Sequence, residues 1–296
     1  MIERTIDTAV IPVAGLGTRM APFTAGEPKF MAGVSEGDKY RPNIDYTLDD
    51  CVGAGIENLV FVISNGGDEH LTRYLGPLSN DVRAQYKKLG KFKELEAEET
   101  RRGTFKDMNI EYVEQRASDP YGTAVPLSLA RAALRGVGNF AVTGGDDFVW
   151  HPGGNSELAL AITGWRDSGT DHAIMGKPIS ARLDATKYGV LRRDSDGCLV
   201  DIDEKPPLER VPDNPLANIS RYILNSELIW PHLEAVLAEQ RGSEQPEYYV
   251  TDVINKAVDA GHTFHVHAVQ GMYFDAGSPK GILEASNRIS QELQIV

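Results

Sequence analysis

The feature that most constrains the fold is a short apolar segment that runs directly into a glycine-rich loop. Residues 8–13 are almost entirely apolar, which is typical of a β-strand covered on both faces. The loop that follows consists of Ala14, Gly15, Leu16, Gly17, Thr18 and Arg19. Glycine allows a tight turn and lets several backbone N–H groups point at one anion, so this arrangement is typical of phosphate binding in α/β proteins.

Two familiar phosphate-binding motifs do not fit the loop. A dinucleotide fingerprint needs a third glycine where Met20 stands, and a P-loop needs a Gly-Lys-Ser or Gly-Lys-Thr sequence that the loop lacks. A tight turn without a ligand is therefore the alternative. Arg19 and Lys29, however, place two cations near the loop in a chain whose net charge is −13, and Pro28 stiffens the approach to Lys29. This combination favours a nucleoside triphosphate site.

Hydrophobic periodicity predicts alternating strands and helices in the first part of the chain. Buried strands are expected at residues 8–13, 59–63, 110–113, 140–143 and 173–175, and helices at residues 44–52, 81–102 and 124–134. After about residue 178 the expected elements are strands at residues 189–192, 199–203, 219–224 and 264–269, helices near residues 227–239 and 251–260, and a C-terminal helix from Ser278. Alternation of this kind predicts a mainly parallel sheet with helices on both faces.

Composition and charge exclude several other classes of protein. Cys51 and Cys198 are the two cysteines of the chain, so a disulfide scaffold or a zinc knuckle is not expected. No apolar run approaches the roughly 20 residues that span a bilayer, and the N-terminus is too polar for a secretory signal, so the expected location is the cytoplasm. The net charge of −13 should repel nucleic acid and anionic membranes, so neither is an expected partner. A phosphorylated ligand would need local cations or a metal to offset that charge.

The N-terminal residues also resemble a known family. Residues 8–20, followed by Pro22, Pro28 and Lys29, are similar to the opening signature of bacterial UTP–glucose-1-phosphate uridylyltransferases, which are sugar-1-phosphate nucleotidylyltransferases. The resemblance implies a Rossmann-like, three-layer α/β/α nucleotidyltransferase fold with a mixed, mainly parallel central sheet and a small sugar-binding subdomain. It implies one domain over residues 1–296, with a nucleotide-binding core at residues 1–177, a sugar-phosphate-binding portion at residues 178–277 and a C-terminal helix at residues 278–296.

The same resemblance implies a reaction, its participants and its residues. The implied enzyme is a homo-oligomer that transfers a nucleotidyl group from UTP to glucose-1-phosphate with the help of Mg²⁺ and releases pyrophosphate. Arg19 and Lys29 would be catalytic. The nucleotide would contact Ala14, Gly15, Gly17, Thr18, Gln115 and Gly122, and the sugar phosphate would contact Gly189, Glu204, Lys205 and Arg221. The metal ligands would be Asp146 and Asp275.

The chemistry of these residue types suits the roles, although each has a simpler alternative. Asp146 follows a predicted core strand, at the edge where open α/β sheets bind ligands, and Mg²⁺ takes few protein oxygens besides phosphates and waters. Asp147 is a helix cap, a support for its neighbour, or the principal metal ligand in place of Asp146. The carboxamide of Gln115 offers a base both a donor and an acceptor, yet Gln115 could equally be a solvated loop residue. Asp275 lies in an Asp-Ala-Gly sequence, which is a frequent turn.

The chain departs from the usual uridylyltransferase pattern around the base, phosphate and sugar sites. Residues 32–40 carry extra residues, and a Gly-Thr-Ala sequence at 122–124, a Gly-Gly pair at 144–145 and Tyr249 replace the usual residues. These changes leave open a dTTP- or CTP-dependent transferase, another sugar, or a non-catalytic regulator that binds a nucleotide sugar. A nicotinamide oxidoreductase is disfavoured, because Met20 replaces the third loop glycine and no acidic residue ends the second strand.

Overall fold

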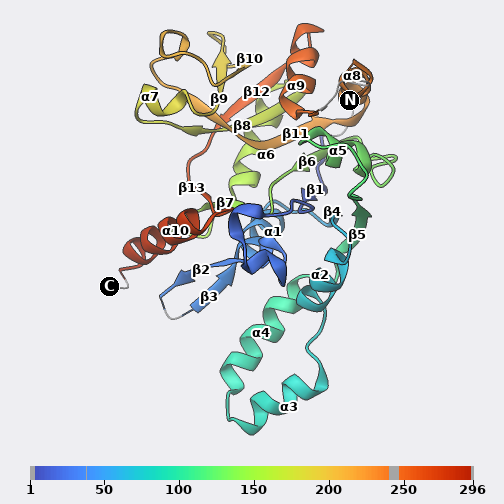
Figure 1. Cartoon of the computed structure of the whole chain (residues 1–296), viewed down its shortest axis with the longest axis vertical. Coiled ribbons are helices and arrows are strands. Elements are labelled where there is room, and N and C mark those ends of the chain that lie inside the picture. The colour runs from blue at the N-terminus through green and yellow to red at the C-terminus, as the bar shows by residue number, and fades with distance from the viewer. Residues whose placement is uncertain (1–3, 38, 240–246, 295–296) are drawn as a thin grey trace.

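A nine-stranded mixed sheet forms the centre of the protein, and the computed structural model describes residues 4–37, 39–239 and 247–294 (Figure 1). The strands of this sheet are β1 (Thr8–Pro12), β4 (Asn58–Ile63), β5 (Asn109–Glu114), β6 (Asn139–Val142), β8 (His172–Pro178), β9 (Gly189–Arg193), β10 (Leu199–Glu204), β11 (Leu216–Asn225) and β12 (Phe264–Ala268). β6, β1, β4 and β5 are consecutive parallel neighbours. β11 joins β6 to β8 in antiparallel pairings, and β12 adds to β8 in parallel. The mixed, mainly parallel sheet predicted from the sequence is confirmed.

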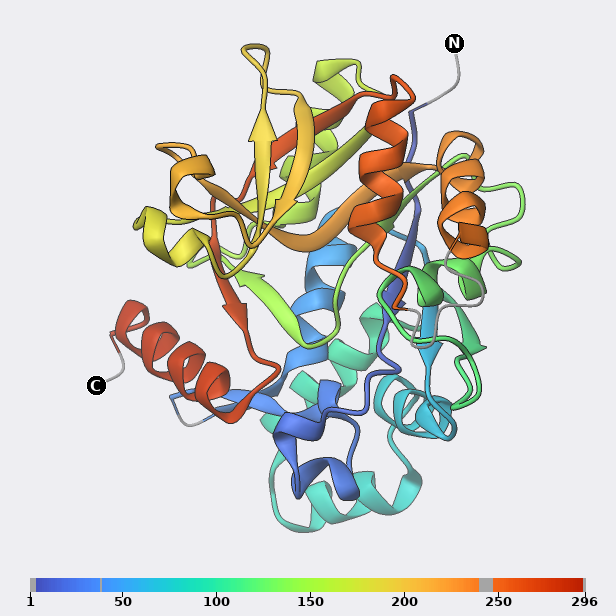
Figure 2. The ribbon, with the colours of Figure 1, turned by 45° about the horizontal axis from the view of Figure 1, so that its top comes forward.

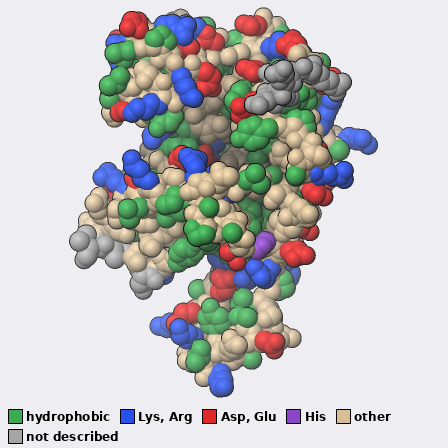
Figure 3. All heavy atoms as spheres, in the orientation of Figure 1, with side chains coloured by type: hydrophobic (Ala, Val, Ile, Leu, Met, Phe, Trp, Pro, Cys, Tyr) green, Lys and Arg blue, Asp and Glu red, His purple; other side chains and the backbone are tan. Residues whose placement is uncertain are grey.

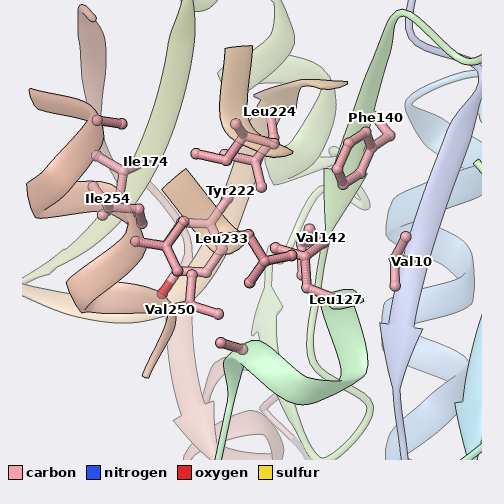
Figure 4. Packing of buried hydrophobic residues seen from close by; sticks show 14 of the residues in the cluster. Val10, Leu127, Phe140, Val142, Ile174, Tyr222, Leu224, Leu233, Val250 and Ile254 are labelled. Atoms are coloured by element: carbon pink, nitrogen blue, oxygen red, sulfur yellow. The ribbon is translucent and has the colours of Figure 1, made fainter. Parts of the chain in front are cut away.

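Both faces of the sheet are covered by helices, because successive residues of each strand point to opposite faces and both are apolar. Val10 of β1 packs into one core, and its neighbours Ala9 and Ile11 pack into the other. Figure 4 shows the first core, in which Val10, Phe140 and Leu233 take part. Its helices are α5 (Ala124–Ala130), α8 (Ser226–Glu239) and α9 (Val250–Asp259), whereas α1 (Asn43–Gly53), α2 (Gly67–Leu75) and α6 (Glu157–Ser168) contribute to the second core. The predicted three-layer fold is confirmed.

The carboxyl edge of the parallel strands is the place where the predicted site residues gather. β1, β4, β5 and β6 run in the same direction, so the loops that follow them leave from one edge. β11 extends past this edge: Tyr222 is opposite Val142, near the end of β6, whereas Leu216 and Ala217 pair with β9. The β9–β10 hairpin pairs with this part of β11, and Figure 2 shows it at the top of the molecule. The segment after residue 178 continues the same sheet.

A two-stranded ribbon that the sequence did not predict lies beside this edge. It consists of β7 (Asp147–Trp150) and β13 (Met272–Asp275), which are antiparallel with Asp147 opposite Asp275. The ribbon packs with Tyr46 of α1, whose ring stacks on Phe148 at a centroid distance of 3.9 Å. The same small core includes residues of α10 (Pro279–Glu292), the predicted C-terminal helix, and of the hairpin β2 (Gly33–Glu36) and β3 (Lys39–Pro42). Residues of segment 32–40, where the extra residues lie, thus form part of the support for the ribbon.

Two helix predictions need correction. The helix expected at residues 81–102 is two helices, α3 (Asn80–Lys88) and α4 (Phe92–Thr104), because Gly90 takes the left-handed conformation at φ 71° and reverses the chain. This hairpin forms a separate knob below the body in Figure 3. α5 ends at Ala130, before the expected residue 134. None of the helices within the described ranges is long and apolar enough to cross a membrane.

A buried carboxylate ties the β7–β13 ribbon to the main sheet. Glu157 is the first residue of α6 and is 1% exposed. It is hydrogen-bonded to Nε2 of His267 in β12 at 2.6 Å and to Nε2 of His151, just after β7, at 2.8 Å. The N–H of Gly271, just before β13, donates to the same carboxylate at 2.8 Å. Four segments that surround the carboxyl edge therefore meet on one side chain.

The Glu157 network should make the stability of the protein depend on acid pH. Burial would raise the pKa of Glu157, but hydrogen bonds from His267, Gly271 and Gln270 outweigh burial and lower it from 4.5 to about 2. The Glu157 carboxylate takes up its proton at a higher pH in the unfolded chain than in the folded protein. Its contribution to the free energy of unfolding is therefore complete above pH 4.5 and is lost as the pH falls toward 2. It amounts to about 3 kcal/mol at most. In urea unfolding between about pH 6 and about pH 3, Glu157→Gln should lose less stability than the wild type, and parallel losses would contradict the prediction.

Candidate active site

The glycine-rich loop lies directly after β1 and is open to solvent. Thr18 and Arg19 are exposed on the short 3₁₀ helix η1 (Thr18–Met20), while Ala14 is half-buried and Gly15 is exposed before it. Gly17 takes the left-handed conformation, with φ 62°. A Cβ on Gly17 would lie 3.1 Å from Cβ of Lys29, the first residue of η3 (Lys29–Met31). The loop and Lys29 therefore form one surface at the carboxyl edge of the sheet.

Lys29 reaches across from this surface to the predicted metal ligands. Its Nζ forms an ion pair with Oδ2 of Asp146. Gly277 packs against the same pair, since a Cβ on Gly277 would lie 2.6 Å from Lys29 Nζ and 2.8 Å from Asp146 Oδ2. The carboxylate of Asp275 accepts a hydrogen bond from the N–H of Gly277 at 3.1 Å. It therefore lies beside Gly277, the residue that packs against the Lys29–Asp146 pair. The structure thus brings the loop, Lys29, Asp146 and Asp275 together.

Asp146 and its neighbour Asp147 have different surroundings. Oδ1 of Asp147 accepts from Arg221 at 3.0 Å and Oδ2 accepts from the hydroxyl of Tyr273 at 2.9 Å. Burial raises the pKa of Asp147, and the charge of Arg221 opposes that rise. The Asp147 side chain is 14% exposed, against 36% for Asp146. Asp146 is therefore the more open carboxylate of the two, and contact of Asp146 with a metal remains a prediction.

The structure does not place Arg221 at a sugar phosphate, contrary to the sequence expectation. Arg221 is 1% exposed, and its guanidinium donates to Thr143 and to Asp147 instead. Burial would lower the pKa of Arg221, but the carboxylates of Asp147 and Asp50 outweigh burial and raise it, so the group stays charged. The reason for the difference is the strand itself: β11 turns this side chain toward α1 and the β6–β7 turn, a burial that the sequence does not reveal.

The residues expected at the base lie on a neighbouring part of the same edge. Gln115 is half-buried and follows β5, and its N–H donates to the carbonyl of Ile63 at 2.8 Å. Gly122 has φ 124°, and a Cβ there would overlap the backbone of Tyr248. A glycine is therefore required at 122 by the packing of two chain segments. Contact of Gln115 and Gly122 with a base remains a prediction.

The residues expected at the sugar phosphate lie on the β9–β10 hairpin. Gly189 is opposite Glu204, and a Cβ on Gly189 would lie 2.7 Å from Oε1 of Glu204. Lys205 is exposed and has φ 46°. Burial raises the pKa of Glu204, while Lys205 and a hydrogen bond from Thr251 oppose the rise. The start of α9 contacts Glu204 through Thr251, and the N–H of Val250 donates to the hydroxyl of Thr123, the residue after Gly122, at 3.0 Å.

The acidic residues suit a cation that brings other ligands with it. Among the described residues, no group of three or more His, Cys, Asp and Glu side chains is arranged to hold a metal ion by itself. Mg²⁺ is commonly held by one or two carboxylates together with phosphates and waters. Asp146 and Asp275 supply two carboxylates at an open edge, and the ammonium of Lys29 already shows that a cation is accepted by Asp146. The donor set therefore fits Mg²⁺.

Sequence reasoning missed the residues beneath the site. Tyr273 donates to Asp147, Thr143 accepts from Arg221, and Gly277 packs on the Lys29–Asp146 pair. The available signal was that two short apolar runs far apart in the chain each lead into aspartate: residues 140–142 are followed by a Thr-Gly-Gly-Asp-Asp sequence, and residues 272–274 by an Asp-Ala-Gly sequence. Periodicity does not reveal such a pairing.

The sequence of this chain is similar to those of known proteins over nearly its whole length. The sequence profile of the family described as nucleotidyl transferase matches residues 8–292. A UTP–glucose-1-phosphate uridylyltransferase of Haemophilus influenzae is 31% identical, with 94% of this chain and 90% of that protein covered. A protein of the same name from Komagataeibacter xylinus is also 31% identical, over 93% of this chain and 90% of that protein.

Solved structures of this kind share the fold over nearly the whole chain. An apo UDP-glucose pyrophosphorylase matches with a TM-score of 0.80 and 27% identity, covering 98% of this chain and 100% of that one. A UTP-bound UGPase from Acinetobacter baumannii matches with a TM-score of 0.77 and 26% identity, covering 98% of both chains. A UDP-glucose pyrophosphorylase complexed with UDP-glucose has a TM-score of 0.76 at 25% identity, covering 97% of this chain and 100% of that one.

Proposed function

Because the chain belongs to the nucleotidyl transferase family, we propose that it transfers a uridylyl group from UTP to glucose-1-phosphate and releases pyrophosphate. The names of the similar proteins and the ligands of the similar structures support both substrates. The observation that carries the proposal is the Lys29–Asp146 ion pair beside the glycine loop at the carboxyl edge of the sheet. Cytoplasmic location and homo-oligomeric assembly remain predictions.

The reaction needs no nucleophile from the protein. An oxygen of the glucose-1-phosphate phosphate attacks the α-phosphorus of UTP in line and forms a new P–O bond. The bond from the α-phosphorus to the oxygen that bridges to the β-phosphorus breaks, and pyrophosphate leaves with that electron pair. Two polyanions must meet in a protein of net charge −13, so catalysis depends on holding them in place and on local positive charge.

Cationic side chains divide this work between the two substrates. Arg19 and the N–H groups of the loop would hold the triphosphate, and Lys29 would neutralise charge that develops at the α-phosphorus. Lys205, exposed on the β9–β10 hairpin, would hold the phosphate of the sugar. Gln115 would hydrogen-bond the base and Glu204 the sugar hydroxyls.

Asp146 and Asp275 would hold Mg²⁺, which when bound supplies positive charge to the phosphate oxygens. In the structure Lys29 neutralises Asp146. If another cation neutralised Asp146, the ammonium of Lys29 would become available for a phosphate oxygen. Lys29 would therefore pair with Asp146 before the nucleotide binds and would be free for a phosphate oxygen once Asp146 and Asp275 held Mg²⁺.

A pyrophosphate-release assay with a panel of nucleoside triphosphates and sugar-1-phosphates tests the function. We expect kcat/KM for UTP with glucose-1-phosphate to exceed that of every other pair by at least about tenfold, since hydrogen bonds to a base discriminate strongly. A higher value with dTTP, CTP or another sugar would replace that part of the proposal. Nucleotide binding without pyrophosphate release for every pair would instead identify a non-catalytic regulator.

A further inference from the structure

Arg221 lies beneath the turn that carries Asp146, and its contacts bracket that turn. One end of the guanidinium, Nη1, donates to the hydroxyl of Thr143, just before the turn. The other end, Nη2, donates to the carbonyl of Asp147 at 2.8 Å and to its Oδ1 at 3.0 Å, just after the turn. Because the guanidinium is a rigid plane, its two ends fix the distance between residues 143 and 147. Asp146 lies between them.

The strand that carries Arg221 is irregular at this point. The pairing of β11 with β8 shifts register between Asn218 and Tyr222. Within the shift, Ser220 takes the left-handed conformation at φ 55°, and its N–H donates to Oδ1 of Asn218 at 3.0 Å. A β-bulge re-aims the side chain beside it, and left-handed backbone at a residue other than glycine is costly. β11 therefore departs from regular geometry directly before Arg221.

The burial of Arg221 is also costly for the fold. The side chain is 2% exposed, and Oδ2 of Asp50 lies 3.8 Å from Nη1, with the carboxylate of Asp147 closer. A buried ion pair of this kind often contributes no net stability relative to apolar residues of the same size. A gain in stability is therefore a weak explanation for burying Arg221. Fixing the geometry of the neighbouring Asp146 is a more specific explanation.

The carboxylate of Asp147 is shared with the second acidic strand. Its Oδ2 accepts from the hydroxyl of Tyr273 at 2.9 Å. Tyr273 lies in β13, two residues before Asp275, and Asp275 is opposite Asp147 in the ribbon. One side chain, Asp147, is therefore connected by Arg221 to the turn with Asp146 and by Tyr273 to the strand with Asp275.

We propose that Arg221 and Tyr273 are positioning residues, which act through Asp147 to hold Asp146 and Asp275 in the relative arrangement that one divalent cation requires. The inference rests on the metal site in the proposed function. It reassigns Arg221 from contact with a sugar phosphate to support of the metal ligands, and it assigns Tyr273 a role in the same support.

Mn²⁺ binding to the protein without nucleotide or sugar, followed by electron paramagnetic resonance, tests the inference. Arg221→Lys keeps the charge but loses the planar fork that reaches Thr143 and Asp147 together, so it should weaken Mn²⁺ binding by about tenfold or more, as is usual when a group that orients a metal ligand is changed. Tyr273→Phe removes one hydrogen bond and should weaken binding by a smaller factor, on the order of threefold or more. At saturating Mg²⁺, both variants should recover much of the wild-type kcat.

Controls separate positioning from general loss of stability. Ile223→Val changes a buried residue two positions along the same strand, and it should lower the unfolding midpoint without changing Mn²⁺ affinity. If Arg221→Lys does not fold, the Mn²⁺ affinity of Tyr273→Phe tests the inference. Affinity within about twofold of the wild type in a folded Arg221→Lys or, failing that, in Tyr273→Phe would overturn this inference alone. A wild-type protein that holds no Mn²⁺, neither alone nor with UTP bound, would overturn the metal site and the inference together.

Discussion

Replacing Lys29 with alanine is expected to lower turnover by at least about a hundredfold, as for loss of one preorganised donor to a developing negative charge. The ammonium is held in a fixed place beside the glycine loop and Gly277, so a solvent cation that is not preorganised is a poor substitute for it. Steady-state pyrophosphate release measures the loss. The same variant should bind Mn²⁺ more tightly in the absence of nucleotide, because Asp146 loses its internal counter-ion.

The combination of slower turnover and tighter metal binding is specific to the ion pair. Lys88→Ala, which changes an exposed lysine at the end of α3, should leave both quantities as in the wild type. Near-normal turnover in Lys29→Ala would remove Lys29 from the mechanism. Unchanged or weaker Mn²⁺ binding would show that Lys29 and the metal do not compete for Asp146.

Replacing Asp146 with asparagine is expected to lower kcat by more than about a hundredfold, because a metal ligand and its charge are lost while the size of the side chain is kept. The KM for UTP should change much less, since Arg19 and the loop still face the triphosphate and Lys29 no longer pairs with a carboxylate. In the wild type, excess chelator should reduce pyrophosphate release to background, and added Mg²⁺ should restore it. Added Mg²⁺ should not restore Asp146→Asn.

An exposed aspartate provides the matched control for this substitution. The Asp213 side chain is 93% exposed, and Asp213→Asn should retain wild-type kcat and the wild-type response to chelator. Full activity of the wild type in excess chelator would refute the metal requirement. Equal losses of kcat and of UTP affinity in Asp146→Asn would point to a nucleotide contact for Asp146 in place of a metal ligand.

Local features were predictable because they depend on residues that are close together in the sequence. β1 follows from a run of apolar residues that both faces of a sheet must cover, and α1 follows from apolar residues at helical spacing before Gly53. The carboxyl edge as the place of the site follows from the order of strands and loops. The charge pattern of residues 81–102 fits a helix throughout, so it did not reveal that Gly90 divides the segment in two.

Features made by distant residues were not predictable from the same signals. β7 and β13 are short, and the pairing of Asp147 with Asp275 depends on how the whole chain is routed. Arg221 was expected at a sugar phosphate because its segment resembles that of the family, but burial and a bulge in β11 decide where its guanidinium points. Gly144 and Gly145, which depart from the family pattern, leave room for Asp147 and Val13, and packing of that kind leaves no periodic trace.

The order in which the chain is synthesised gives the β7–β13 pairing another consequence. A nascent chain that has reached residue 177 contains the glycine loop, Lys29 and Asp146, but it contains neither Arg221 nor the strand with Asp275. Asp275 can take its place opposite Asp147, next to Asp146 in sequence, only after β13 has joined β7. Under the proposed function, a chain that ends before β13 would carry the glycine loop and Asp146 but would lack Asp275, the second expected metal ligand.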